Sequence, residues 1–161
     1  MKLIHFSLLL CLCSLLCLSG CSKPANPEGR LDVSGTITFN GGPFEGTTVR
    51  TIIFESVNDQ SLGSTSAPII LETGKFLCTG HDGLKPGKYR VKFYAQALYD
   101  KRTKAPIGPD FGNDEGDDAF RYSVNFLPPD FNEKSTIEFE VVAGRKNVFD
   151  YNIETSYVPT P

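Results

Sequence analysis

The sequence predicts an all-β protein, an antiparallel β-sandwich of seven or eight short strands. Apolar and polar residues alternate with a period of two in several short segments, which is the pattern of strands with one buried face. Turn-forming Gly, Pro and Asn residues separate these segments, and no stretch shows a sustained helical period. The 161 residues leave room for one ordinary domain behind a short leader.

The leader begins with Lys2 and an uncharged, mostly apolar run over residues 3–18, which is short for a membrane span. It ends in Leu18-Ser19-Gly20-Cys21, which resembles a bacterial lipobox. The resemblance implies a signal peptide over residues 1–20, cleavage between Gly20 and Cys21, and a diacylglyceryl group on the Cys21 sulfur. About two or three acyl chains on one residue would hold the protein firmly in a bilayer. We therefore expect a membrane-anchored lipoprotein of the cell envelope.

Lipidation also decides the number of cysteines that remain. Three of the five cysteines lie in the leader and Cys21 carries lipid, so the mature chain keeps Cys78 alone and forms no intrachain disulfide. Loss of Lys2 changes the net charge from −3 to −4, which suggests no basic face for nucleic acid. Ser22 matches the sorting rule for the outer membrane of two-membrane bacteria.

Residues 21–30 contain two prolines and a glycine without a hydrophobic pattern, and we expect them to form an extended tether of roughly 3 Å per residue. A β-sandwich domain over residues 31–155 and a tail over residues 156–161 follow. The expected strands cover residues 31–39, 47–55, 68–71, 76–79, 88–98, 121–126, 137–141 and 149–153.

Three of these strands have a predicted inner face. The inner residues are Leu31, Val33, Ile37 and Phe39 in the first strand, Val49, Thr51 and Ile53 in the second, and Tyr89, Val91, Phe93 and Ala95 in the fifth. A hairpin or corner is expected at residues 40–43, a polar loop at 57–66, and turns at 73–75 and 143–146. Gly35 inside a strand suggests a bulge or a close backbone approach.

The segment from Tyr99 to Phe120 is rich in charges, glycine and proline, so we expect a long irregular loop with a functional role. Its acidic side chains suggest calcium, which takes six to eight oxygen ligands. The candidate ligands are Asp110, Asp114, Asp117 and Asp118, with Asn113 and Glu115 nearby. The spacing does not match an EF-hand, and a hydrated acidic loop without metal is the alternative.

The same region is rich in aromatic residues, which can stack on sugar rings. They are Tyr94, Tyr99, Phe111, Phe120 and Tyr122, with Tyr99 and Phe111 the candidate ligand-binding residues. The alternative is that they pack in the core or pair within the sheet.

Cys78 and His81 suggest a thiolate nucleophile beside a base. The alternative is a small apolar Cys78 that points inward with Phe76, and a His81 that lies in a polar turn. We expect this alternative, and no catalytic residues, metal or cofactor.

Several segments resemble the transthyretin-like, carboxypeptidase-regulatory-like domains found in many bacterial lipoproteins. They are Val33-Ser34-Gly35-Thr36-Ile37, residues 42–49, Gly74-Lys75-Phe76, residues 84–91, residues 127–136 and Asn147-Val148-Phe149-Asp150. The resemblance implies a seven-stranded Greek-key sandwich that serves as an accessory, structural or binding module without catalysis. The related hydroxyisourate hydrolases use several histidines and a Tyr-Arg-Gly-Ser terminus, which this chain lacks.

Together these features predict a non-enzymatic, membrane-anchored envelope lipoprotein whose sandwich is a structural or protein-interaction module. A carbohydrate-binding module at the envelope is the alternative. The expected partners are the membrane, other envelope proteins or a polysaccharide.

Overall fold

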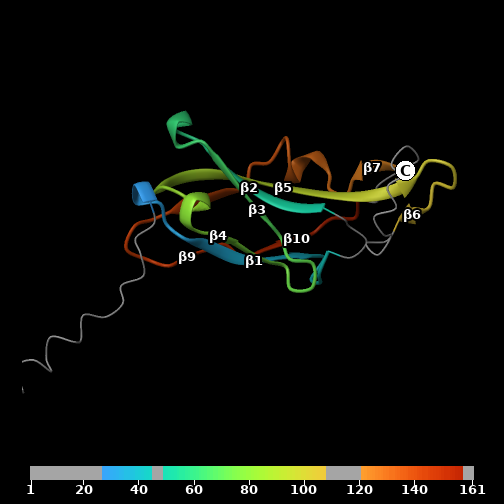
Figure 1. Ribbon diagram of the computed structural model, residues 1–161, viewed down its shortest axis with the longest axis horizontal. Helices are drawn as coiled ribbons and strands as arrows, with labels where there is room; N and C mark the ends of the chain where they lie inside the picture. Colours follow the sequence, from blue (N-terminus) through green and yellow to red (C-terminus); the bar gives the residue numbers. More distant parts are fainter. Residues whose placement is uncertain (1–26, 45–48, 108–120, 158–161) are drawn as a thin grey trace, which may run out of the picture.

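Two β-sheets lie face to face in the computed structural model, which describes residues 27–44, 49–107 and 121–157 (Figure 1). This arrangement confirms the predicted all-β sandwich. The first sheet contains β1 (Val33–Phe39), β4 (Lys75–Cys78), β9 (Asn147–Val148) and β10 (Tyr151–Ile153). The second contains β2 (Val49–Ser56), β3 (Ser64–Pro68), β5 (Gly87–Asp100), β6 (Pro106–Ile107), β7 (Arg121–Asn125) and β8 (Glu138–Val141). Short 3-10 turns lie at Pro27–Gly29, Gln60–Leu62, Gly80–Asp82 and Pro129–Phe131.

The second sheet is organised around β5, which has 14 residues and spans roughly 45 Å. The predicted inner residues of this strand are all buried: Tyr89, Val91, Phe93 and Ala95. Strand β2 pairs along one edge of β5, whereas β8 and β7 pair in succession along the other. The strand continues two residues past its predicted end at Leu98, because β6 and β7 pair with its last residues.

The predicted inner face of β2 is wrong. The fully buried residues are Ile52 and Phe54, whereas Thr51 and Ile53 lie partly exposed. Directly opposite residues of paired strands share a face, and Ile52 pairs with buried Phe93. The register with β5 therefore decides which face of β2 is buried, and the local alternation of β2 does not reveal it.

The strand pairs are mostly antiparallel, as predicted, but β1 pairs in parallel with β9 and β10. Residues 40–43 were expected to form a hairpin or a corner. They form a corner, because β1 and β2 belong to different sheets. Asn40 and Gly41 both have positive φ and close a tight turn in which Phe39 and Gly42 exchange backbone hydrogen bonds of 2.7 and 3.0 Å. The chain then crosses to the other sheet, where β2 begins.

Strand β3 falls partly in the expected polar loop 57–66, and residues 69–71 of the expected strand 68–71 belong to no strand. Residues 64–68 form a strand because they are hydrogen-bonded to β2, although the Ser and Thr residues of β3 show no hydrophobic pattern. Buried Ile69 still reaches the core from the connection that leads to β4.

Aromatic rings fill the space between the sheets around Phe149. Its ring meets Phe139 edge to face at 5.2 Å and stacks on Tyr151 at 5.8 Å, spacings typical of favourable ring pairs. The Phe149 carbonyl group approaches the backbone of Gly35 so closely that a Cβ atom there would collide with it. Of the two explanations given for Gly35, the close backbone approach is thus the correct one.

Candidate functional site

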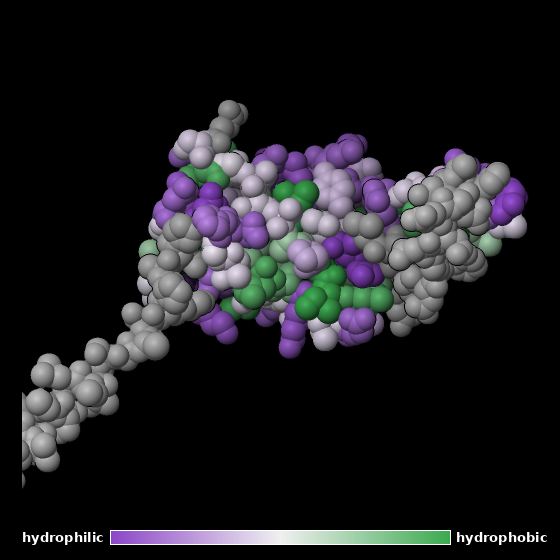
Figure 2. Space-filling view, in the orientation of Figure 1, coloured by the Kyte–Doolittle hydropathy of each residue, from purple (hydrophilic) through white to green (hydrophobic). Residues whose placement is uncertain are grey.

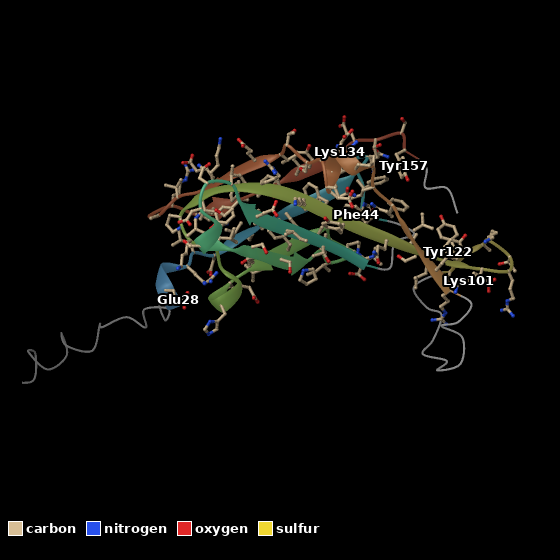
Figure 3. All side chains as sticks on the ribbon, turned by 90° about the horizontal axis from the view of Figure 1, so that it is seen from above. Glu28, Phe44, Lys101, Tyr122, Lys134 and Tyr157 are labelled. Carbon is tan, nitrogen blue, oxygen red and sulfur yellow. The ribbon has the colours of Figure 1, made fainter. Side chains whose placement is uncertain are left out.

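The far end of β5 is the candidate ligand-binding end, because β6 and β7, which border residues 108–120 in the sequence, pair with it there. Leu98 and Tyr99 pair with both β6 and β7, so these two strands flank β5 after β2 has ended. Figure 3 shows Tyr122 and Lys101 at this end and Glu28 at the opposite end of the molecule. The sandwich is therefore elongated, with Glu28 at one end and the turn between β5 and β6 at the other.

Tyr99 and Tyr122 are directly opposite each other on β5 and β7, and their rings stack at 5.8 Å with an angle of 28°. The ammonium group of Lys104 lies 4.9 Å from the centre of the Tyr122 ring, which is a cation–π distance. The Tyr122 hydroxyl is buried and has no hydrogen-bond partner among the described residues. Tyr99 thus pairs within the sheet, as the alternative to sugar stacking predicted. Phe111 lies outside the described residues, so the carbohydrate hypothesis stays untested.

The turn between β5 and β6 is ordered by the Asp100 carboxylate, which accepts hydrogen bonds from the backbone N–H groups of Thr103 at 2.9 Å and Arg102 at 2.7 Å. These backbone donors hold the pKa of Asp100 below its usual range. Lys104, with positive φ, donates its N–H to the Asp100 carbonyl at 2.9 Å. The start of the predicted irregular loop is therefore a defined turn with exposed cationic side chains.

The calcium candidates Asp110, Asp114, Asp117 and Asp118 lie outside the described residues. Within the described ranges, no group of three or more His, Cys, Asp or Glu side chains is placed to hold a metal ion. The calcium hypothesis therefore stays a prediction about the loop.

Cys78 and His81 do not form an exposed nucleophile and base. The Cys78 side chain is fully buried in β4, and this burial raises its pKa to about 12. A thiol with that pKa stays protonated and unreactive at neutral pH. His81 is exposed in the 3-10 turn that follows. The structure confirms that Cys78 is a small apolar residue of the core.

The end where the chain enters is fixed by several contacts. The Arg30 guanidinium donates a 2.8 Å hydrogen bond to the Gly83 carbonyl, and Leu31 and Leu84 exchange backbone hydrogen bonds of 2.7 and 3.0 Å. Glu28 lies 3.7 Å from Arg30, within ion-pair range. Cys21 and the leader lie outside the described residues.

The surface is mostly hydrophilic or neutral, with small separate hydrophobic areas on the face seen in Figure 2. Five large apolar side chains of the described residues are exposed: Val57, Ile70, Leu77, Val148 and Tyr157. None of the described helices is long and apolar enough to cross a membrane.

No family model matches the sequence, and no curated protein matches it either. Among solved structures, the chain is similar to the crystal structure of a "putative adhesin" from Bacteroides ovatus, with 14% identity and a TM-score of 0.43. The match covers 85% of this chain and 49% of the other, so the chain spans about half the length of that protein. At this identity and TM-score the similarity carries no functional argument, and the resemblance to transthyretin-like domains stays a prediction.

Proposed function

We propose that the protein is a membrane-anchored lipoprotein of the cell envelope whose β-sandwich is a non-enzymatic structural or protein-interaction module. The sequence Leu18-Ser19-Gly20-Cys21 after an apolar run supports lipidation of Cys21, after cleavage between Gly20 and Cys21. Ser22 supports the outer membrane as the destination. Of the expected tether over residues 21–30, residues 27–30 instead form a turn held against the sandwich, so residues 21–26 would join the lipid to it.

The observation that best supports this role is the position of the entry point. Arg30 and Leu31 attach the start of the domain to one end of an elongated sandwich, and Lys101 and Tyr122 lie at the other end (Figure 3). The six residues from Cys21 to the 3-10 turn at Pro27–Gly29 span at most roughly 20 Å, and β5 adds roughly 45 Å. An anchored domain of this shape holds its sheets and its far end within reach of other envelope molecules.

The absence of catalysis is part of the proposal. It is supported by Cys78, the strongest nucleophile candidate of the mature sequence, which lies in the core with a pKa of about 12. A buried neutral thiol packs as a small apolar side chain.

The anchor is tested by expression of the full chain in a bacterium that processes lipoproteins. The Cys21→Ser variant should lose incorporation of labelled palmitate and leave the membrane fraction, because the lipid has no attachment point. Cys17→Ser is the matched control, since it changes another leader cysteine and should leave anchoring intact. Membrane association of Cys21→Ser at the level of the unmodified chain would refute the anchor.

A further inference from the structure

The outer edge of β3 offers unpaired backbone groups to a partner strand. Ser56 donates to the Gly63 carbonyl and Ile69 donates to the Arg50 carbonyl, so the odd-numbered residues around β3 face β2. In an antiparallel ladder the alternate residues point the other way. The N–H and C=O groups of Ser64 and Ser66, and the C=O group of Pro68, therefore face outward. No described residue pairs with this edge of the sheet.

Edge strands normally carry charged side chains that block further pairing. Strand β8, on the opposite border of the sheet, follows this rule with exposed Glu138 and Glu140. Strand β3 has the uncharged sequence Ser-Thr-Ser-Ala-Pro, and its three outward residues are exposed. Only Pro68, which lacks an N–H group, limits pairing, and it does so at one end.

Two exposed apolar side chains flank β3 in the sequence. Val57 is 37% exposed and precedes the short connection to β3, and Ile70 is 52% exposed and lies two residues after Pro68. The backbone of Ile70 turns away from the edge, since its N–H group donates to the Lys75 carbonyl at 2.9 Å. Val57 and Ile70 are two of the five exposed large apolar residues of the described chain.

A depression of about 450 Å³ borders the start of β3, and the cationic side chain of Arg90 lines it. Its lining residues are Glu55, Ser56, Val57, Gly63, Ser64 and Arg90. Arg90 lies between Glu55 and Glu138 in the register, but these carboxylates form ion pairs with Lys92 at 2.8 Å and with Lys88 at 2.6 Å. Arg90 itself forms no ion pair with the described residues. The depression is thus complementary to an acidic side chain that reaches over the small Ser64.

We propose that the β3 edge binds an extended peptide segment of another protein by strand addition, with an acidic side chain of that segment directed to Arg90. Main-chain hydrogen bonds supply affinity in this mode, and the depression supplies specificity. The proposal deepens the protein-interaction role proposed above and rests on it. A partner strand could form about five backbone hydrogen bonds with this edge, to the N–H and C=O groups of Ser64 and Ser66 and to the C=O group of Pro68.

A second copy of the chain is the less suitable occupant. In an antiparallel self-pair centred on Ser66, each Pro68 faces Ser64 of the other copy. Pro68 has no N–H group to donate, so each Ser64 carbonyl loses its bond and about four bonds remain. Such a pair also brings two Arg90 side chains and no additional carboxylate to the interface.

The test screens a phage-displayed random decapeptide library against the mature lipidated protein in nanodiscs. The enriched peptides should contain an acidic residue within an alternating β-type pattern. Their affinity should fall about tenfold or more for Ser66→Pro, which removes an outward N–H group and blocks close pairing. Ser66→Ala is the matched control, because it keeps the backbone donor, and it should bind within about twofold of the unmodified protein.

Arg90→Gln is a second variant, on an exposed side chain, that leaves the strand backbone unchanged. The variant should lower the affinity of the acidic peptides at least about fivefold. The affinity of peptides with Asn or Gln in place of the acidic residue should stay unchanged. Thermal unfolding of each variant verifies that the fold is intact. Binding should also slow hydrogen exchange at the Ser64 and Ser66 amides of the unmodified protein.

Three outcomes would overturn the proposal. If peptides are enriched but bind Ser66→Pro and Ser66→Ala equally, the interaction role survives and the β3 edge is excluded. If no peptide is enriched, the β3 edge and the protein-interaction role both fail, whereas a structural role and the anchor, tested separately through Cys21, are unaffected. If sedimentation shows a dimer that Ser66→Pro dissolves, the edge belongs to a second copy.

Discussion

The carbonyl oxygen of Phe149 lies against the backbone of Gly35, in the place that a side chain at residue 35 would occupy. Phe149 also donates its N–H to the Ser34 carbonyl at 2.9 Å, so its backbone cannot retreat without losing a bond between two adjoining segments. Glycine at residue 35 is therefore a condition for the contact between β1 and the chain that connects β9 to β10.

Gly35→Ala should destabilise the domain by about 1–3 kcal/mol or more, because the added methyl group forces β1 and Phe149 apart. The measurement is the midpoint of urea unfolding of the purified domain. Gly42→Ala is the matched control: its φ is not in the left-handed region, and the nearest atom to an added Cβ is the Phe39 carbonyl oxygen at 3.9 Å. Equal midpoints for the two variants would contradict the close approach.

Burial of Cys78 predicts a loss of stability in alkaline solution. Its pKa of about 12 in the folded chain exceeds the ordinary value of 9.0. The unfolded chain therefore loses its proton first, and stability falls as the pH rises from about 9 toward 12. Unfolding midpoints between pH 8 and 10.5 measure this slope, which Cys78→Ala should reduce. Some slope will remain, because burial also raises the pKa of Tyr89. An unchanged slope would show that the thiol is not buried in solution.

Protection of Cys78 also predicts slow alkylation of the folded protein. Iodoacetamide at pH 8 should modify the thiol only at the rate of unfolding, because the reactive thiolate is scarce and enclosed. His81→Ala should leave this rate unchanged, since His81 is exposed in a separate turn. Rapid alkylation that His81→Ala abolishes would instead support a nucleophile and base.

Loss of the Asp100 carboxylate should loosen the turn before β6. In Asp100→Ala the amides of Arg102 and Thr103 should exchange with solvent about tenfold faster, because both donate to that carboxylate. Acidification should act in the same direction: the pKa of Asp100 is lowered by folding, so its contribution is lost as the pH falls through that value. Asp130→Ala in the exposed turn after β7 is the control, and comparable exchange at Arg102 in both variants would contradict the prediction.

A glycan array probed with the soluble domain distinguishes the carbohydrate alternative. We expect no specific glycan to bind, because Tyr99 stacks on Tyr122 within the sheet. Specific binding that Tyr99→Ala or Phe111→Ala removes would favour the carbohydrate-binding module. Tyr157→Ala is the control, since Tyr157 is an exposed tyrosine outside this pair.

The strand content was predictable where a strand carries its own alternation. The inner face of β5 follows directly from Tyr89, Val91 and Phe93, and Cys78 was placed correctly by its parity with Phe76. Strand β2 was not predictable in this way, because Thr51 and Ile53 give an alternation as acceptable as that of Ile52 and Phe54. Its face depends on β5, some 40 residues away in the chain.

The candidate site was predictable only in part. The sequence predicts that an irregular loop begins at Tyr99, whereas Tyr99 lies in β5, and it does not indicate that Tyr122 is its partner. That pairing depends on the register between β5 and β7. The sequence does not indicate strand β3, because its Ser, Thr and Pro residues at a sheet edge show no apolar–polar alternation.

The amino-acid sequence by itself determined that the protein is an all-β domain and that Cys78 is the one cysteine left if Cys21 is lipidated, since both follow from local patterns of side chains. Tertiary structure alone decided the parallel pairing of β1, the close approach of Phe149 to Gly35, and the open edge of β3. These features are made by backbone hydrogen bonds between distant segments. Every residue except proline offers the same backbone groups, so such pairings leave little trace in the order of side chains.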